Sequence, residues 1–414
     1  MKNSLIKNIL SLFSIQTINY FLPLLFIPYL VKTLGMENFG VYTLVLAGIQ
    51  YLIIITDYGF NYTITREISI NRDNKDKINI LFSSTILCKS ILAMISITII
   101  ILFNLLSPHS EIIKEALYFG ILLIIGNVFF PIWLFQGYEK MGFLAISNFI
   151  ARVICVPLIF IFVNNKNDIY LAIFIQGVTS ILASVISMLI VYKYKLASIK
   201  KCNFLDIKNN LKAGWDIFVS TSFVSLYINS IPIILGSTSG NESVGIYAAA
   251  DKIRQAIQGL IGPVSQALYP RLSNLMIKSQ KDAISLIRKV IIFFVLPLFL
   301  ICLFIFIASS DLVRILYDNA SYDCVIVLKI LIFIPPIIAL GNVIGVQLML
   351  PLGLFKEFSR TYIISGIIGF PLLYFLSLEY SYIGVAISSI TIETVVLIIF
   401  TYFLLKKIIF KGLL

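Results

Sequence analysis

Twelve long apolar stretches follow one another along this chain, and a few of them carry a charged residue near their middle. A helix of about 20 apolar residues crosses the roughly 30 Å hydrocarbon core of a bilayer. A charged side chain at the centre of such a helix costs about 2.5–3.5 kcal/mol on insertion scales. A charged residue is retained at this position when its side chain faces a hydrated cavity that binds a ligand. We therefore expect a multi-pass membrane protein with a functional polar interior.

The composition agrees with this class. Of the 414 residues, 59% are hydrophobic and 13% are charged, and the mean hydropathy is +0.99. A soluble domain is roughly half apolar and about one quarter charged. The first stretch is too long for the core of a signal peptide and is expected to be a retained span. Polar breaks divide the chain into twelve predicted spans: 10–31, 41–60, 80–106, 115–135, 143–163, 169–192, 214–235, 245–268, 290–308, 324–350, 358–377 and 382–405.

Positively charged side chains set the predicted orientation, because they are retained on the cytoplasmic side. Most of the 32 lysines and arginines fall into one alternate set of loops and ends, whereas the other set holds Lys32, Lys114, Lys166 and Arg314. Both termini are therefore predicted to be cytoplasmic. The same asymmetry accounts for the net charge of +12, so we expect no nucleic-acid partner.

Other functional classes lack the residues that they need. No polar break is long enough for a soluble catalytic or ATP-binding domain, and no Gly-x-x-x-x-Gly-Lys-Ser/Thr stretch occurs. The chain is therefore not expected to be an enzyme. Its five cysteines are scattered and His109 is its only histidine, which leaves almost no ligands for a zinc or haem site. No cofactor is expected, and any energy must come from an ion gradient.

The two halves of the chain contain similar local strings. Leu34-Gly35 and Gly40-Val41-Tyr42 in the first half match Leu235-Gly236 and Gly245-Ile246-Tyr247 in the second. The offset between Tyr42 and Tyr247 also aligns Gln50 with Gln255, Asn61 with Gln266 and Arg66 with Arg271. We predict two six-helix lobes, 1–192 and 214–414, joined by a basic cytoplasmic linker, 193–213. Parallel repeats of this kind place a substrate between two lobes that rock, which favours a carrier.

The eighth predicted span has a polar stripe. Its members recur at spacings of three and four residues, which places them on one face of a helix. They are Asp251, Arg254, Gln255, Gln258, Gly262, Ser265 and Gln266. The first span has a shorter version that includes Gln16 and Asn19. A polar stripe inside a bilayer has to face other helices or water.

Several charged residues lie at middle depth in their predicted spans. The cations are Lys89, Arg152 and Arg254, with Asn148 on the same face as Arg152, and the acids are Asp251 and Glu393. The excess of positive charge favours an anionic ligand, and the planar guanidinium group can hold two phosphate oxygens at once. Asp251 and Glu393 are candidates for H+ or Na+ coupling. Structural ion pairs between helices are the alternative for each of these charges.

Local strings along nearly the whole chain resemble those of the polysaccharide transporter family. The most specific is Trp133-Leu-Phe-Gln136-Gly137-Tyr-Glu139-Lys140-Met141, which we interpret as mainly structural. The others are Asp57-Tyr-Gly-Phe-Asn61 running on to Thr65-Arg66-Glu67-Ile68, Lys89, Tyr269-Pro270-Arg271-Leu272-Ser273, and Gly345-Val-Gln347 followed by Gly353 and Lys356.

This resemblance implies a Wzx-type flippase of the multidrug/oligosaccharidyl-lipid/polysaccharide (MOP) exporter superfamily. Such a protein would have two six-helix lobes around a central cavity in a bacterial inner membrane. Its implied substrate is an undecaprenyl-pyrophosphate-linked oligosaccharide repeat unit of O-antigen or capsule, moved to the outer leaflet. For this substrate we predict a pyrophosphate and sugar groove of eight residues: Arg152, Arg254, Lys89, Gln255, Gln258, Asn148, Gln16 and Asn19. A polysaccharide polymerase and a chain-length regulator are its implied partners. Twelve spans fit this branch better than the fourteen expected of the lipid II flippase branch.

Two alternatives stay open on the sequence alone. A multidrug antiporter of the same superfamily would favour an acid-rich groove for cationic drugs, whereas the predicted groove is basic. A polysaccharide polymerase or membrane glycosyltransferase would need a large outer loop or a cluster of loop carboxylates and arginines. The longest predicted outer loop, 309–323, has only Asp311, Arg314, Asp318 and Asp323 for such a role.

Overall fold

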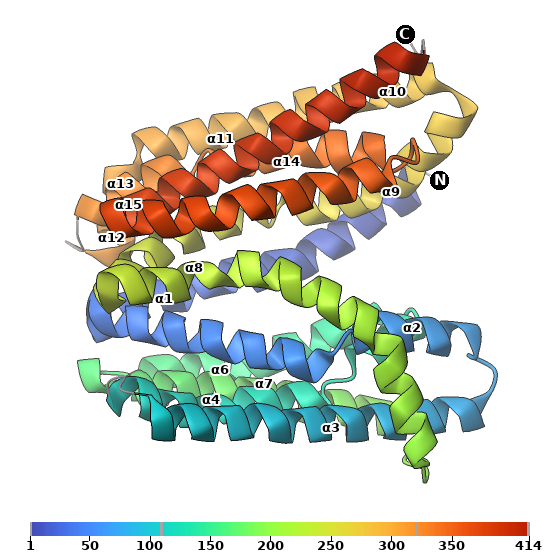
Figure 1. The fold of residues 1–414 in the computed structure, drawn as a ribbon, viewed down its shortest axis with the longest axis vertical. Coiled ribbons are helices and arrows are strands. Elements are labelled where there is room, and N and C mark those ends of the chain that lie inside the picture. Colours follow the sequence, from blue (N-terminus) through green and yellow to red (C-terminus); the bar gives the residue numbers. More distant parts are fainter. Residues whose placement is uncertain (1, 108–110, 319–321, 412–414) are drawn as a thin grey trace. The chain divides into compact units, whose positions relative to one another are not determined.

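The computed structural model describes the backbone of residues 2–107, 111–318 and 322–411. Within these ranges it leaves out the side chains of residues 2–22, 220, 223–228, 267, 270, 277 and 407–411. His109 lies outside the described residues. Figure 1 shows that the described chain folds into helices without a β-strand.

The helices follow the predicted apolar runs. Those of the first half are α1 (Lys2–Asp57), α2 (Phe60–Ile70), α3 (Lys75–Leu106), α4 (Glu111–Phe129), α5 (Ile132–Gly137), α6 (Met141–Phe162), η1 (Lys166–Asp168) and α7 (Ile169–Lys193). Those of the second half are α8 (Phe204–Gln258), α9 (Ile261–Lys278), α10 (Gln280–Val290), η2 (Ile291–Val295), α11 (Leu296–Ile307), α12 (Ser309–Tyr317), α13 (Tyr322–Leu331), α14 (Ile334–Ile344), η3 (Gly345–Met349) and α15 (Phe355–Lys411).

Among the described residues, eight helical stretches are long and apolar enough to cross a membrane. Two of them, Pro23–Ile70 and Phe355–Lys406, have 48 and 52 residues, about twice the length that one crossing needs. The predicted all-α, multi-pass membrane class is therefore confirmed. The total of twelve spans and the cytoplasmic position of both termini stay predictions.

Three of the long helices contain a residue with non-helical dihedral angles. These residues are Gly35 (φ 78°, ψ 165°) in α1, Gly240 (φ 85°, ψ 174°) in α8 and Ser381 (φ 51°, ψ −134°) in α15. Positive φ is a region that glycine enters without steric cost. Gly35 and Gly240 have nearly the same backbone geometry and are separated by the same offset as Tyr42 and Tyr247. The counterpart of Gly35 is therefore Gly240 and not Gly236, which corrects one pairing of the predicted repeat.

The chain forms two compact units. One comprises Met1–Lys32 and Ile234–Leu414, and the other comprises Thr33–Ile233. The first predicted span of each half is thus grouped with later spans of the opposite half. The linker 193–213 lies wholly within the second unit. The division into lobes 1–192 and 214–414 stays a prediction.

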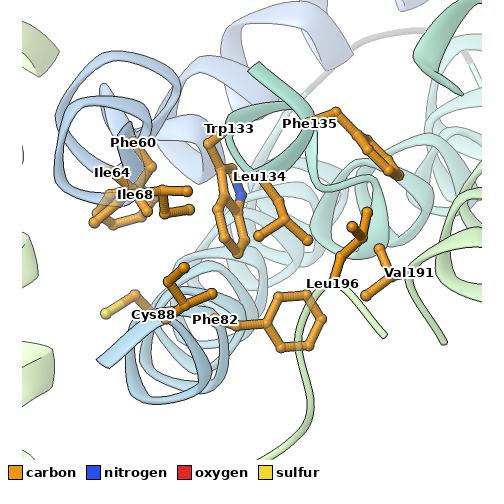
Figure 2. Packing of buried hydrophobic residues seen from close by; sticks show 11 residues of the cluster. Phe60, Ile64, Ile68, Phe82, Cys88, Trp133, Leu134, Phe135, Val191 and Leu196 are labelled. Atoms are coloured by element: carbon orange, nitrogen blue, oxygen red, sulfur yellow. The ribbon is translucent and has the colours of Figure 1, made fainter. Parts of the chain in front are cut away.

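Close helix packing builds the second unit. α7 packs against both α4 and α6, and α4 packs against α3. Gly177 on α7 makes one such approach possible, because a Cβ atom there would lie 2.6 Å from Leu122 Cβ on α4. Figure 2 shows a second contact region, where the fully buried Trp133 of α5 lies among side chains of α2 and α3. Its ring centroid is 5.7 Å from that of Phe82.

Gly177→Ala is expected to destabilise the protein, because the added methyl group would have to displace Leu122 at the α4–α7 contact. Overpacking of this kind costs about 1–3 kcal/mol. The midpoint of thermal unfolding of the detergent-solubilised protein should therefore fall. Gly142→Ala is the matched control, since a Cβ atom there meets no heavy atom within 4 Å. Equal midpoints for the two variants would contradict the close contact.

Candidate functional site

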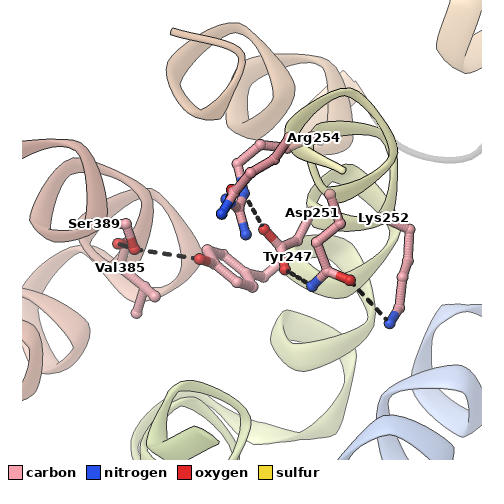
Figure 3. A network of polar contacts seen from close by, with 8 residues as sticks. Tyr247, Asp251, Lys252, Arg254, Val385 and Ser389 are labelled. Carbon is pink, nitrogen blue, oxygen red and sulfur yellow. Dashed lines mark hydrogen bonds and ion pairs between the residues drawn. The ribbon is translucent and has the colours of Figure 1, made fainter. Parts of the chain in front are cut away.

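Four polar side chains form a connected network on one face of α8. The Nε atom of Arg254 donates to Oδ1 of Asp251 at 2.5 Å, and Nε2 of Gln255 donates to Oδ2 of the same carboxylate at 2.6 Å. Nη1 of Arg254 donates to Oε1 of Gln258. The spacings of three and four residues bring these groups together because a helix turns once in about 3.6 residues. Figure 3 shows Asp251 and Arg254 in this arrangement.

The network lies in a largely buried environment. The side chains of Arg254 and Asp251 are 15% and 13% exposed, while Ile253, Ala256 and Ile257 of the same helix are buried. Burying an isolated charge would be expensive. Asp251 and Arg254 reduce this cost because each supplies the counter-charge of the other.

Two further side chains connect this face of α8 to α15. The hydroxyl groups of Tyr247 and Ser389 lie 3.2 Å apart, and Ser389 donates to the carbonyl oxygen of Val385 (Figure 3). Glu393, one turn beyond Ser389, interacts electrostatically with Arg254. Asp251 therefore pairs directly with this guanidinium group, and Glu393 is near enough for an electrostatic interaction with it.

One nitrogen atom of the Arg254 guanidinium group keeps its hydrogen-bonding capacity. Its Nε and Nη1 atoms are engaged by Asp251 and Gln258, and Nη2 has no hydrogen-bond partner among the described residues. Nη2, with its two N–H donors, can therefore bind an anionic oxygen. Lys252 lies on the flank of the network and donates to Oε1 of Gln255 at 3.4 Å.

Lys89 has a different environment, in the second unit. Its ammonium group donates to Oδ1 of Asp57 at 2.9 Å and to the carbonyl oxygen of Asn127 at 2.8 Å, and its side chain is 1% exposed. The carbonyl group of Asn127 would ordinarily accept from the N–H group four residues later, but that residue is Pro131, which has none. The N–H group of Phe130 donates to this carbonyl oxygen at 3.4 Å, and Lys89 adds a shorter, charged hydrogen bond.

The Lys89 contacts join two helix breaks. Asp57 ends α1 just before Tyr58 and Gly59, which have φ angles of 45° and 79°, and Asn127 precedes the break at Pro131 between α4 and α5. This geometry favours a structural role for Lys89 in the described conformation. Asp57 was not predicted as the partner of Lys89. The sequence does contain two helix-breaking strings at these positions, Asp57-Tyr-Gly and Asn127 followed by Pro131.

The remaining predicted groove residues are not part of the α8 network. Arg152 and Asn148 lie half-buried on α6 in the second unit, and Lys89 lies fully buried on α3 in the same unit. Gln16 and Asn19 lie in α1, but their side chains fall outside the described residues. The structure thus brings together Arg254, Gln255 and Gln258 with Asp251 and Glu393. The assignment of all eight residues to one groove stays a prediction.

The specific string around Trp133 is held by structural contacts. Thr65 on α2 donates to Oε1 of Gln136 at 3.3 Å, and Arg72 donates to the carbonyl oxygen of Gly137 at 2.9 Å. Arg72 also forms an ion pair with Glu139 at 2.6 Å. These contacts clamp the end of α2 to α5, as expected of a mainly structural motif.

A similar contact occurs in the second half. Nε2 of the buried Gln347 donates to the carbonyl oxygen and to the hydroxyl group of Ser265, at 3.0 Å and 2.9 Å. It connects η3 to α9, and no pattern in the sequence identified this pair in advance.

Lys89→Met is expected to destabilise the protein more than Asp57→Asn does, because it leaves the Asp57 carboxylate without its cation and the Asn127 carbonyl group with only the N–H group of Phe130 at 3.4 Å. An unsatisfied buried polar group costs about 1–3 kcal/mol. The double variant should lose less stability than the sum of the two single variants, as measured by unfolding titration in detergent. The exposed pair Asp76 and Lys200 is the control and should show weaker coupling. Additive effects at Lys89 and Asp57 would contradict this account.

Comparison with known proteins identifies the family. The family model described as "Polysaccharide biosynthesis protein" matches residues 5–276. A protein of Escherichia coli (strain K12) that carries the name "Putative O-antigen transporter" is 38% identical over 395 residues, covering 95% of each chain. A protein of the same name from Shigella dysenteriae is 31% identical over 408 residues, covering 97% of this chain and 99% of the relative.

Solved structures with a similar fold are membrane transporters. Lipid II flippase MurJ in its inward closed conformation superposes with a TM-score of 0.72, at 16% identity, covering 95% of this chain and 87% of MurJ. An inward-facing multidrug resistance MATE family transporter of the MOP superfamily superposes with a TM-score of 0.66, at 16% identity, covering 95% and 97%. These likenesses confirm the predicted MOP-like fold. The chain belongs to the polysaccharide biosynthesis protein family.

Proposed function

We propose that the protein is a flippase for undecaprenyl-pyrophosphate-linked oligosaccharide repeat units of O-antigen or capsule type. It would move them from the inner to the outer leaflet of the bacterial inner membrane by alternating access between its two halves. The relatives named as O-antigen transporters support this substrate class. The fold shared with a lipid II flippase supports the reaction type. The protein would act as a carrier and not as an enzyme.

Physical chemistry explains why such a substrate needs a carrier. A short oligosaccharide has about ten hydroxyl groups, and each costs roughly 4 kcal/mol to bury in hydrocarbon without a partner. A barrier of about 40 kcal/mol makes unassisted crossing negligibly slow. The protein needs to supply a hydrated path for the head group, while the polyprenyl chain stays in lipid.

The observation that carries the proposal is the largely buried guanidinium group of Arg254, whose Nη2 atom has no hydrogen-bond partner among the described residues. Its Nη2 atom can donate to a diphosphate oxygen, and the amide groups of Gln255 and Gln258 beside it can exchange their present partners for sugar hydroxyl groups. Diphosphate binding would also compete with Asp251 for the guanidinium group. A carboxylate released in this way becomes available to a proton or a sodium ion, which would couple substrate binding to an ion gradient.

Arg254→Gln is expected to reduce surface polysaccharide roughly 10–100-fold, because one charge-assisted hydrogen bond contributes about 1.5–3 kcal/mol. In a strain without the wild-type gene, lipid-linked repeat units should then accumulate on the inner leaflet.

The double variant Asp251→Asn, Arg254→Gln tests whether Arg254 binds the diphosphate or only neutralises Asp251. If Arg254 only neutralises Asp251, the double variant regains transport; if Arg254 binds the diphosphate, it stays inactive. Lys329→Gln, at equal membrane level, is the control for removal of a cation elsewhere in the same unit.

Glu393→Gln is expected to remove the dependence of transport on an imposed pH or sodium gradient. The measurement is the rate at which a lipid-linked oligosaccharide changes leaflet in proteoliposomes with and without each gradient. Glu379→Gln provides an exposed acid on the same helix for comparison. Unchanged gradient dependence in Glu393→Gln removes this residue from the coupling site.

A multidrug antiporter is the second candidate, because the fold is shared with a multidrug transporter and two acids lie at Arg254. Such a protein would export cationic dyes from cells that contain no lipid-linked repeat units. The relatives named as O-antigen transporters favour the flippase. A polysaccharide polymerase and a chain-length regulator are the protein partners that this function would bring to the membrane.

A further inference from the structure

The segment that runs from the end of α7 into the first turns of α8 exposes large apolar side chains. Ile199, Phe204 and Leu205 are 87%, 80% and 64% exposed, and Trp215 in the first turns of α8 is 54% exposed. We call residues 193–215 the linker surface. Exposed apolar side chains in this number are typical of a surface that contacts a partner or a membrane.

The linker surface is also strongly basic. It carries Lys193, Lys195, Lys200, Lys201, Lys208 and Lys212, whereas Asp206 is its single acidic residue. Asp206 accepts from the backbone N–H group of Asn203 at 2.8 Å and caps the start of α8. Lys201, Lys208 and Lys212 are exposed. The positive charge is thus concentrated beside the apolar side chains.

The backbone of the linker surface is fixed to α3. Ser198 donates its N–H group to Asn79 at 2.8 Å, and Lys200 donates its N–H group to Ser83 at 2.8 Å. Further along, Asn210 donates to the hydroxyl group of Ser84 at 2.9 Å. Both partners of each contact lie in the same compact unit. The apolar side chains are therefore held outward by an ordered backbone.

We propose that the linker surface binds anionic phospholipid head groups of the leaflet next to it. The segment directly follows α7 and leads into α8, which places it at the level of the head groups. Apolar side chains that reach the acyl boundary, with lysines around them, form the pattern of an interfacial membrane anchor. The ammonium groups of Lys201, Lys208 and Lys212 bind lipid phosphates, and Ile199, Phe204 and Leu205 contact the acyl chains.

This inference is independent of the transported substrate. The linker surface shares no residue with the α8 network around Arg254. Loss of lipid binding would leave the flippase proposal intact, and failure of that proposal would leave the lipid site intact. A soluble protein with an acidic surface is the competing occupant, and it predicts no preference among lipids.

Trp215 makes the proposal directly measurable, because it lies in the linker surface while Trp133 is fully buried. The full-length protein is placed in two nanodisc preparations with the same lipid composition and the same bromine content. In one, the bromine atoms are on phosphatidylglycerol; in the other, they are on phosphatidylcholine. We expect stronger quenching of Trp215 by brominated phosphatidylglycerol. Trp215→Phe gives the contribution of Trp133 for subtraction.

Replacing Lys201, Lys208 and Lys212 together by glutamine should abolish the difference between the two preparations. Each lysine near an anionic membrane changes affinity by about fivefold, so the triple variant should lose at least tenfold in preference. The same three positions changed to arginine keep the charge and should keep the preference. Equal quenching of the wild type by both lipids, absence of quenching by either, or a glutamine variant that behaves like the wild type would overturn the proposal.

Discussion

The absence of hydrogen-bonding partners in hydrocarbon constrains every part of this protein. A polar group within a membrane-spanning helix must find its partner in the protein or in water. The ammonium group of Lys89 therefore binds the Asp57 carboxylate and the carbonyl oxygen of Asn127, which receives no hydrogen bond from Pro131. The same requirement places Asp251 and Gln258 at Arg254. A charged residue inside a membrane-spanning helix therefore marks either a structural contact between helices or a binding site.

Exposure and remaining hydrogen-bonding capacity separate these two cases. Lys89 is almost fully buried and joins two helix breaks in one unit, so the fold uses its charge. Arg254 is partly exposed, keeps one nitrogen without a described partner, and has acids on two helices nearby. A ligand that competes for Arg254 would change the state of Asp251. In the proposed mechanism, substrate binding and ion binding would thus be linked through one guanidinium group.

Regular helical spacing made part of this predictable from the sequence. Asp251, Arg254, Gln255 and Gln258 were expected to share a face, because their spacing depends only on the geometry of one helix. The pair formed by Lys89 and Asp57 was not predicted, since it joins distant residues through breaks at Gly59 and Pro131. The counterpart of Gly35 was misplaced because short strings align in more than one register, and backbone dihedral angles identify Gly240. The first span of each half belongs to the same compact unit as spans of the opposite half. This grouping depends on tertiary packing and therefore could not be predicted from local spacing.

Accessibility of the α8 face to water tests the central claim most directly. The five native cysteines would be replaced, and a single cysteine introduced at Gln258, which leaves Arg254 in place. A membrane-impermeant maleimide should label this cysteine from one aqueous side, and a lipid-linked oligosaccharide should protect it. A cysteine at the buried Ile257 should stay unlabelled as the control. Absence of labelling at position 258 from both sides of the membrane would contradict a water-filled binding site at Arg254.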